Sequence, residues 1–533
     1  MSASALSSAC APAHFGDITL AGADILGISA QLLTNVTETS LGDFRYTQPT
    51  VQLTNASFCN VTVTYTHPGQ GDRISVEAWL PLTNWNNRYQ AVGGGGWIAG
   101  RSYISYVNMY GALADGFATS STDAGLYPVG SPEAAPWATV SPGNPNLYNL
   151  NNMASVSLND QAILSKAIIK QFYGSGPEYS YWSGCSQGGR QGLMLAQRYP
   201  DAYDGISAGA PAINWSEFIQ AIQWPQQVMN ELGYYPFPCE LDALTAAAVT
   251  ACDGLDGIED GIIGEPVACL KEFDPFSKVG TTIQCAQTNS SMAITQAAAV
   301  VANATWNGMT TAGGKQTWFG ILPGTDITGS SILAPGASPV AATTCNATAC
   351  VGTPMIIGPE WIKFFVARDA ELDLQNITRK DWDRLAHLSL SMYNSMVGSN
   401  DPDLSLFRER GGKIVSFHGL ADIIIPPQGS EHYYKAVEAE VGNMDEFYRY
   451  YEVPGLAHCY GGNGGRPDSL FAQLRLWVEN GTLPESSPHK ITNKQGTTEN
   501  RILCPYPQKA IYDPSCGQTG NADCFSCAVV SEL

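Results

Sequence analysis

The amino-acid sequence predicts an α/β protein in which helices cover a largely parallel β-sheet. The main observation is alternation, because short runs rich in β-forming residues alternate with segments of helical spacing in the first part of the chain. A second observation is that the pattern of a buried strand returns late, at residues 413–417, after a long segment of different composition. We therefore expect one α/β domain that is interrupted by a large insertion.

The expected elements follow each other in a regular order. Strands are predicted at 61–65, 74–80, 89–92 and 179–183, with a helix at 161–172. Near residue 210 the character of the sequence changes: a helix is predicted at 240–252, and from there to about residue 400 the chain is predicted to be irregular and is rich in Gly, Thr and Ala. Strands at 413–417 and 448–453 and a helix at 470–478 complete the pattern. The predicted division is an α/β domain formed by 1–212 and 401–533, with a lid domain at 213–400.

Charge and cysteine content restrict the environment and the partners. A net charge of −21 with only 27 Lys and Arg argues against nucleic acid and anionic membranes as partners. The chain has 14 cysteines and nine Asn-x-Ser/Thr sequons, a combination typical of an oxidising, glycosylating secretory route. We expect a secreted, extracellular protein, a monomer or homodimer, whose signal peptide has been removed, because the first ten residues lack the features of one.

A candidate nucleophile lies in the sequence Gly184-Cys-Ser-Gln-Gly188. In the G-x-S-x-G pattern, two glycines permit a sharp strand-to-helix turn that exposes the serine hydroxyl, here that of Ser186. The alternative is a purely structural glycine turn. If Ser186 is the nucleophile, the backbone N–H of Gln187 is one expected oxyanion donor. The second donor is expected from the glycine-rich stretch 93–96, with Gly95 and Gly96 as candidates between which the sequence does not decide.

The expected general base is His458, in a loop after a predicted strand, and the expected orienting carboxylate is Asp422. The order Ser186, Asp422, His458 is that of α/β-hydrolases, so we predict an α/β-hydrolase catalytic domain with a large inserted lid domain. Asp123 precedes the serine and is interpreted as structural.

The serine and the histidine each have a cysteine neighbour, Cys185 and Cys459. If these two are bonded, their Cα atoms lie roughly 5.5–6 Å apart, and the bond holds Ser186 beside His458. The rival interpretation, in which Cys185 is itself the nucleophile, requires a free thiol.

An acidic loop after the helix at 240–252 is a candidate calcium site. Asp253, Asp256 and Asp260 follow each other at spacings of three and four, with glycines between them. Clustered oxygen ligands of this kind suit Ca²⁺, and backbone carbonyls would complete the coordination. The spacing is not that of an EF-hand, and a solvated acidic turn is the alternative.

Several motifs together resemble the tannase and feruloyl esterase family. They are Gly-Cys-Ser-Gln-Gly-Gly-Arg at 184–190, the glycines at 93–96, His-Gly-Leu-Ala-Asp at 418–422 and His-Cys at 458–459. The resemblance implies an α/β-hydrolase with a large lid, the triad Ser186, Asp422 and His458, and a Cys185–Cys459 disulfide. It also implies a structural lid calcium held by the side chains of Asp253, Asp256 and Asp260 and the carbonyls of Ile258 and Ile262. The implied further disulfides are Cys10–Cys59, Cys239–Cys285, Cys252–Cys269 and Cys504–Cys527, with Cys345–Cys350 and Cys516–Cys524 left by elimination.

The resemblance implies phenolic esters attached to plant polysaccharide as substrates. Feruloyl esterase is favoured over tannase because the chain lacks the Lys-Arg or Arg-Arg site that similar fungal tannases often carry in the lid. The alternative outside enzymology is a glycan-binding protein on an inactive hydrolase scaffold. Lid aromatics at 306, 318, 361 and 364–365 are expected to sandwich the phenolic ring.

Overall fold

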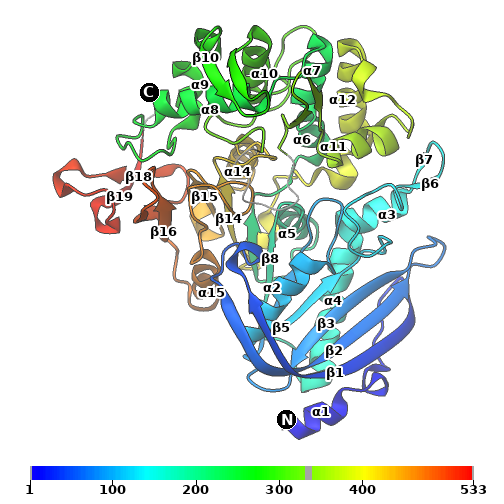
Figure 1. Ribbon diagram of the computed structural model, residues 1–533. Helices are drawn as coiled ribbons and strands as arrows, with labels where there is room; N and C mark the ends of the chain where they lie inside the picture. Colours follow the sequence, from blue (N-terminus) through cyan, green and yellow to red (C-terminus); the bar gives the residue numbers. More distant parts are fainter. Residues whose placement is uncertain (1–2, 330–338, 531–533) are drawn as a thin grey trace.

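The computed structural model describes residues 3–329 and 339–530, and its centre is a nine-stranded sheet (Figure 1). In spatial order the strands are β1 (Asp24–Ser40), β2 (Val51–Thr66), β3 (Ile74–Pro81), β5 (Ala118–Thr122), β4 (Arg88–Val92), β8 (Tyr179–Cys185), β9 (Gly205–Gly209), β14 (Lys413–Gly419) and β15 (Tyr448–Val453). The pairs from β1 to β5 are antiparallel, and the five pairs from β5 to β15 are parallel. The predicted α/β class is therefore confirmed.

Helices cover both faces of this sheet. They are α2 (Tyr103–Ala114), α4 (Ser157–Tyr173), α5 (Gln187–Arg198), α14 (Gln428–Val441) and α15 (Leu470–Asn480). Successive residues of a strand point to opposite faces. Accordingly, Trp182 of β8 packs in the core with α4, α5 and α14, whereas Tyr181 packs in the core with α15. Both faces are apolar, which explains why the central strands are buried along their whole length.

Residues 213–400 add no strand to the central sheet and lie beyond the ends of β8 and β14 (Figure 1). Their helices are α6 (Trp215–Ala221), α7 (Trp224–Leu232), α8 (Pro238–Cys252), α9 (Pro266–Glu272), α10 (Gln296–Asn307), α11 (Ile357–Glu360) and α12 (Arg379–Tyr393). Two hairpins join them, formed by β10 (Thr282–Cys285) and β11 (Ser290–Ala293), and by β12 (Thr343–Cys345) and β13 (Cys350–Gly352). The expectation of irregular chain in this segment is wrong at α10 and α12. Residues 330–338, also within it, lie outside the described residues.

The lid aromatics occupy positions that differ from the expected ones. Trp306, Trp318, Trp361 and Phe365 are buried in the apolar core of the lid, and Phe364 packs against that core. Because these rings fill the interior, the expectation that they sandwich a substrate ring is wrong. The same core includes Trp97, which directly follows the glycines at 93–96 and is 1% exposed. Its ring centroid lies 5.2 Å from that of Trp215 and 5.7 Å from that of Phe365.

The C-terminal part forms two small hairpins beside the lid. They are formed by β16 (Ser487–Thr492) with β17 (Thr498–Leu503), and by β18 (Gln508–Tyr512) with β19 (Phe525–Val529). Shorter elements elsewhere are α1 (Ala3–Ala9), α3 (Leu147–Asn151), α13 (Ser405–Glu409) and the strand pair β6 (Thr139–Ser141) and β7 (Asn144–Pro145). Within residues 3–329 and 339–530, no helix combines the length and the apolar character needed to cross a bilayer.

Seven disulfides pair all 14 cysteines. Five are pairings implied by the family resemblance, namely Cys10–Cys59, Cys185–Cys459, Cys239–Cys285, Cys252–Cys269 and Cys504–Cys527, and the other two, Cys345–Cys350 and Cys516–Cys524, are the pairs left by elimination. No thiol is left for the rival interpretation of Cys185 as a nucleophile. That interpretation is therefore wrong.

Candidate active site

Ser186 lies at the sharp turn between β8 and α5. Its backbone has φ 62° and ψ −122°, a conformation that is unfavourable for a residue with a Cβ atom and that marks functional turns. Gly184 and Gly188 permit the turn, because a Cβ atom on Gly184 would lie only 2.6 Å from the carbonyl of Gly188. A β-carbon on Gly188 would in turn lie 3.1 Å from the carbonyl oxygen of Gly94. The turn therefore presents Ser186 directly beside the glycine loop, residues 93–96.

The glycine loop is fixed to helix α5 by hydrogen bonds. Gly93 N–H donates to Ser183 O at 3.2 Å, and Gly94 N–H donates to the side-chain oxygen of Gln191 at 3.2 Å. Gln191 also donates to Ala99 O at 2.9 Å, at the far end of the loop. Since the amides of the first two glycines are occupied, Gly95 and Gly96 remain the candidates for the second oxyanion donor. Gln191 was not identified from the sequence. The feature that could have identified it is its position five residues after Ser186, on the helix that follows the serine.

A buried arginine fixes the residue after the serine. Arg190 Nε donates to the side-chain oxygen of Gln187 at 2.7 Å. Its other nitrogens donate to three oxygens: Ala154 O at 2.9 Å, Ser399 Oγ at 2.9 Å and Met153 O at 3.0 Å. Burial, with a contribution from the charge of Arg198, lowers the pKa of Arg190 to about 9. The side chain of Gln187 is thus fixed by a buried cation, which makes no ion pair with a carboxylate among the residues that the structure describes.

Asp422 and His458 are in direct contact. His458 Nδ1 lies 2.7 Å from Asp422 Oδ2, so the ring donates from Nδ1 and keeps Nε2 free to accept a proton. Asp422 is fully buried, and its other oxygen accepts the backbone N–H groups of Ile424 at 2.8 Å and Ile425 at 2.9 Å. The carboxylate that the sequence placed after β14 is therefore fixed on both sides.

A second histidine, which reasoning from the sequence did not assign, binds the same carboxylate. His418 Nε2 lies 3.0 Å from Asp422 Oδ2 and 3.2 Å from Ile425 O, and Nδ1 lies 2.7 Å from Ser430 Oγ. Both partners of Nε2 are acceptors, so Nε2 carries the hydrogen. Burial alone would raise the pKa of Asp422, but the charge of His458 and the hydrogen bond from His418 hold it below its usual value. The sequence feature that could have indicated this contact is the four-residue spacing between His418 and Asp422.

The Cys185–Cys459 disulfide joins the two halves of the candidate site. The Cα atoms of the two cysteines are 6.0 Å apart although 274 residues separate them in sequence. Within the part of the chain that the structure describes, Ser186 Oγ makes no hydrogen bond with His458. Catalytic contacts of this kind are often long before substrate binds. Asp422 and His458 are thus joined by a hydrogen bond. Ser186 and His458 are linked through the disulfide between the cysteines next to them, Cys185 and Cys459.

The third carboxylate considered, Asp123, lies elsewhere. It accepts the backbone N–H groups of Ser75 at 2.8 Å and Gly125 at 2.9 Å, and it forms an ion pair with Arg101 at 3.3 Å. These partners belong to β3 and to the loops around β5. They account for Asp123 as a structural residue, as the sequence order predicted.

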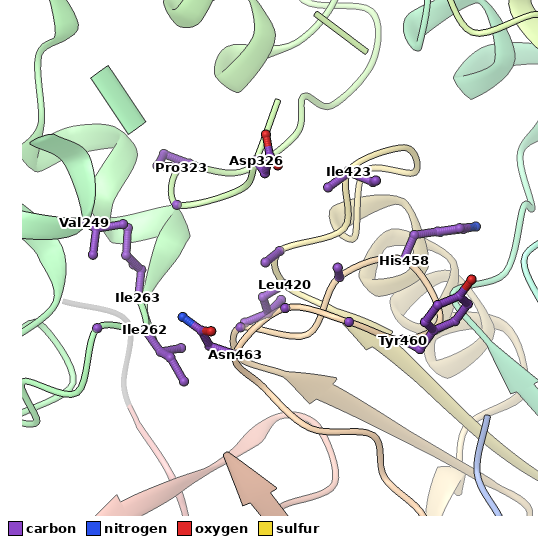
Figure 2. Close-up of a pocket in the computed structure, with 17 residues that line it drawn as sticks. Val249, Ile262, Ile263, Pro323, Asp326, Leu420, Ile423, His458, Tyr460 and Asn463 are labelled. Carbon is purple, nitrogen blue, oxygen red and sulfur yellow. The ribbon is translucent and has the colours of Figure 1, made fainter. Parts of the chain in front are cut away.

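A cavity of about 380 Å³ lies between the lid and the histidine loop, residues 454–465 (Figure 2). On the lid side, Val249, Ile262, Ile263, Pro323 and Asp326 line it, and on the other side lie Leu420, Ile423, His458, Tyr460 and Asn463. His458 and Tyr460 lie together at one end of the cavity (Figure 2). The cavity therefore borders the histidine loop and carries both apolar and polar groups, but Ser186 is not among the residues that line it.

Comparison with known proteins identifies the family. The family described as "Tannase and feruloyl esterase" matches residues 59–528. The chain belongs to this family. A probable feruloyl esterase from Arthroderma benhamiae is 39% identical over 490 residues, which make up 90% of this chain and 87% of the relative. Feruloyl esterase B from Aspergillus niger is 30% identical over 488 residues, 86% of this chain and 84% of the relative.

The fold of this member of the tannase and feruloyl esterase family is also similar to that of a solved structure. Tannin acyl hydrolase from Aspergillus niger superposes with a TM-score of 0.84 at 27% identity. The match covers 99% of this chain and 94% of the other. The predicted α/β-hydrolase fold is thereby confirmed, whereas the exact boundaries of the lid, 213–400, stay a prediction.

The acidic loop of this family member, residues 252–262, lies between α8 and α9. Asp253 accepts the backbone N–H groups of Asp260 at 3.0 Å and Gly261 at 2.7 Å. Asp256 and Asp260 line a cavity of about 120 Å³ that Ile258 and Ile262 also line. Burial, together with the negative charges of Asp260 and Asp253, raises the pKa of Asp256 to about 6. The loop therefore concentrates negative charge that a bound cation would stabilise.

Two basic side chains already contact this loop. Arg501 lies 3.3 Å from Asp260, and Lys494 lies 3.4 Å from Asp253. Among the described residues, no group of three His, Cys, Asp or Glu side chains is close enough to hold a metal ion. The oxygen donors are therefore of the type that suits Ca²⁺, but in this conformation three of the carboxylates do not converge.

Proposed function

We propose that the chain is a secreted serine carboxylesterase that hydrolyses feruloyl-type hydroxycinnamate esters of plant cell-wall polysaccharides. The single observation that carries the proposal is the Asp422–His458 contact beside the strained Ser186 turn, with a disulfide between the two neighbouring cysteines. The 39% identity to a probable feruloyl esterase supports the choice of acyl group. Seven disulfides support an extracellular location, because such bonds persist in oxidising compartments.

In the proposed mechanism, His458 Nε2 takes the proton of Ser186 as Oγ attacks the ester carbonyl. Asp422 stabilises the imidazolium, and the N–H groups of Gln187 and of Gly95 or Gly96 bind the oxyanion. His458 then returns the proton to the departing alcohol, leaving an acyl-enzyme. Water, activated by His458, hydrolyses the acyl-enzyme by the same route and regenerates Ser186.

Tannase activity, the hydrolysis of galloyl esters, is the second candidate. It is favoured by one observation, the superposition on tannin acyl hydrolase over 99% of this chain. Both activities would use the same triad. They differ in the acyl group of the ester, which is a hydroxycinnamoyl group in one case and a galloyl group in the other. The choice between them therefore depends on the acyl pocket and not on the catalytic residues.

The purified chain is expected to hydrolyse methyl ferulate and methyl caffeate, with little turnover of methyl gallate. Initial rates on the three esters, followed by liquid chromatography of the released acids, distinguish the candidates. Dominant turnover of gallate would make the chain a tannase. A fluorophosphonate probe is expected to label Ser186, as mapped by peptide mass spectrometry. A chain that neither turns over these esters nor reacts with the probe would be an inactive scaffold, contrary to the proposal.

We further propose that the acidic loop binds a structural Ca²⁺ through Asp253, Asp256, Asp260 and the carbonyls of Ile258 and Ile262. The support is the oxygen-rich donor set of the loop, in which burial and the charges of Asp260 and Asp253 raise the pKa of Asp256. No step of the esterase reaction involves this ion. Its expected contribution is to stabilise the lid beside the C-terminal hairpins.

Removal of calcium is expected to lower the melting temperature by several degrees. Binding to the folded state alone adds about 2.7 kcal/mol to the free energy of unfolding when free Ca²⁺ exceeds its Kd a hundredfold. Differential scanning fluorimetry of the parent with Ca²⁺ and with EDTA measures the shift. Asp256→Asn is the matched variant. Because it lacks one of the proposed ligands, its melting temperature should be the same with Ca²⁺ and with EDTA. Equal melting temperatures of the parent in both conditions would contradict the proposal.

A further inference from the structure

Three aromatic rings form a continuous strip on the surface. Phe44, in the short turn Gly42–Phe44, lies with its ring centroid 5.7 Å from that of Tyr103 and 5.6 Å from that of Tyr460. The interplanar angles are 81° and 72°, so each pair packs edge to face. Tyr103 is 68% exposed, and the other two rings are half-buried. Three segments that are far apart in sequence thus contribute to one aromatic strip: Phe44, Tyr103 and Tyr460.

The aromatic strip connects the two sides of the candidate active site. Tyr460 belongs to the histidine loop, where its N–H donates to His458 O at 2.8 Å, and it lies beside His458 in Figure 2. Tyr103 begins helix α2, just after the glycine loop, and Ser105 of the same helix donates to Gly93 O at 3.1 Å. The strip therefore links the histidine loop to the start of α2, the helix that follows the glycine loop.

The charged side chains around the strip are paired with one another. Arg466 lies against Gly42, at the start of the turn that carries Phe44, and it pairs with Asp43 at 3.3 Å and Asp468 at 3.3 Å. A surface of aromatic rings whose neighbouring charges are already paired fits a neutral ligand better than an ionic one. In the lid, Trp306, Trp318, Trp361 and Phe365 are buried in its core, so these four rings do not supply a comparable surface beside His458.

We propose that the aromatic strip is a subsite for the sugar on the alcohol side of the ester. This inference rests on the proposed function, in which His458 returns a proton to the departing alcohol. The alcohol must then lie against the loop that carries His458 and Tyr460. Sugar rings have apolar C–H faces, which pack on aromatic rings, while the hydroxyl groups of Tyr103 and Tyr460 can bond to sugar hydroxyls. The ligand class is a neutral pentose- or hexose-containing polysaccharide.

The test compares a polymeric and a small substrate of the same acid. In Tyr103→Ala, the ratio of kcat/KM for feruloylated arabinoxylan fragments to kcat/KM for methyl ferulate is expected to fall at least fivefold. Tyr103→Phe keeps the ring and should retain most of the ratio. Tyr148→Ala is the matched control, because Tyr148 is also an exposed tyrosine, 52% exposed, on the separate helix α3. An unchanged ratio in Tyr103→Ala would overturn the proposal, as would an equal loss in the Tyr148 control.

A binding measurement keeps this test independent of the esterase reaction. Isothermal titration of the parent with arabinoxylan fragments that carry no ester should show binding, which weakens at least fivefold in Tyr103→Ala. Absence of binding to the parent would overturn the subsite. If the parent binds these fragments but does not hydrolyse methyl ferulate, the proposed acyl specificity fails while the subsite stands.

Discussion

The Asp422→Asn variant is expected to lose about 10⁴-fold in kcat, the size of effect that loss of the orienting carboxylate has in a serine triad. The asparagine oxygen can still accept the N–H groups of Ile424 and Ile425, so the loop should keep its shape. Its amide nitrogen then donates to His458 Nδ1, while His418 Nε2–H loses its acceptor at this position and keeps Ile425 O as its partner. The ring must carry its hydrogen on Nε2 in that arrangement, and it can no longer take the proton of Ser186.

Methyl ferulate turnover by the parent, Asp422→Asn and Ser186→Ala measures this effect, and circular dichroism checks the fold. Ser186→Ala sets the background, because it lacks the nucleophile. If Asp422→Asn retained more than a tenth of the parental kcat, Asp422 would not be the orienting carboxylate. In that case a carboxylate other than Asp422 would have to be sought beside His458.

The lowered pKa of Asp422 also predicts the shape of the pH profile. A carboxyl whose pKa is lower in the folded state than in the unfolded state adds stability above its unfolded pKa, about 3.9. That stability is lost only as the pH falls through the folded value. Asp422 therefore stays ionised throughout the range in which the enzyme works, and a loss of activity between pH 4 and 7 arises from other groups.

Removal of the Cys185–Cys459 disulfide is expected to produce the largest loss of stability among single disulfide deletions. Closing a loop of 274 residues lowers the entropy of the unfolded chain by an amount equivalent to about 5.6 kcal/mol, and strain often reduces the measured value. In Cys185→Ala with Cys459→Ala, the histidine loop also loses its covalent link to the Ser186 turn. We therefore expect a fall in kcat as well as in melting temperature.

The matched control is Cys516→Ala with Cys524→Ala. It removes a disulfide near the C-terminus whose two cysteines are only eight residues apart in the sequence. The chain-entropy argument gives about 2.5 kcal/mol for that bond, and the site is remote from Ser186 in the sequence. Chemical denaturation and methyl ferulate kinetics of both double variants separate the two roles. A Cys185–Cys459 deletion that is as active as the parent would show that the bond only stabilises the fold.

The sequence permits the prediction of elements and residues that have a local signal. The strand before Ser186, the glycines around it and the cysteines beside Ser186 and His458 carry such signals. The strand β9 does not, because Gly205–Gly209 carries only one bulky side chain, that of Ile206. Gly205 is small because Tyr181 of the neighbouring strand would lie 2.6 Å from a Cβ atom there, which is a tertiary requirement. The Ala-rich helix α10 was missed for a related reason, since its small apolar face is defined only by the core that it contacts.

In the candidate site, the roles of Gln191, Arg190 and His418 depend on contacts between segments distant in sequence or on burial. Gln191 reaches a loop almost a hundred residues earlier, and Arg190 reaches Ser399 in the lid. The wrong expectation for the lid tryptophans has the same origin, because composition does not distinguish a ring in a core from a ring in a pocket. Sequence patterns thus predict the candidate reacting groups better than they predict the residues that fix those groups in position.

The packing of Trp97 has a consequence for how substrate enters. This ring directly follows the glycine loop and is buried among the aromatic side chains of the inserted domain. A hinged opening of that domain, as in a flap that uncovers a lipase site, would pull the expected oxyanion donors out of position. We therefore expect the inserted domain to keep its position during turnover, so that an oil–water interface is not needed to activate the enzyme.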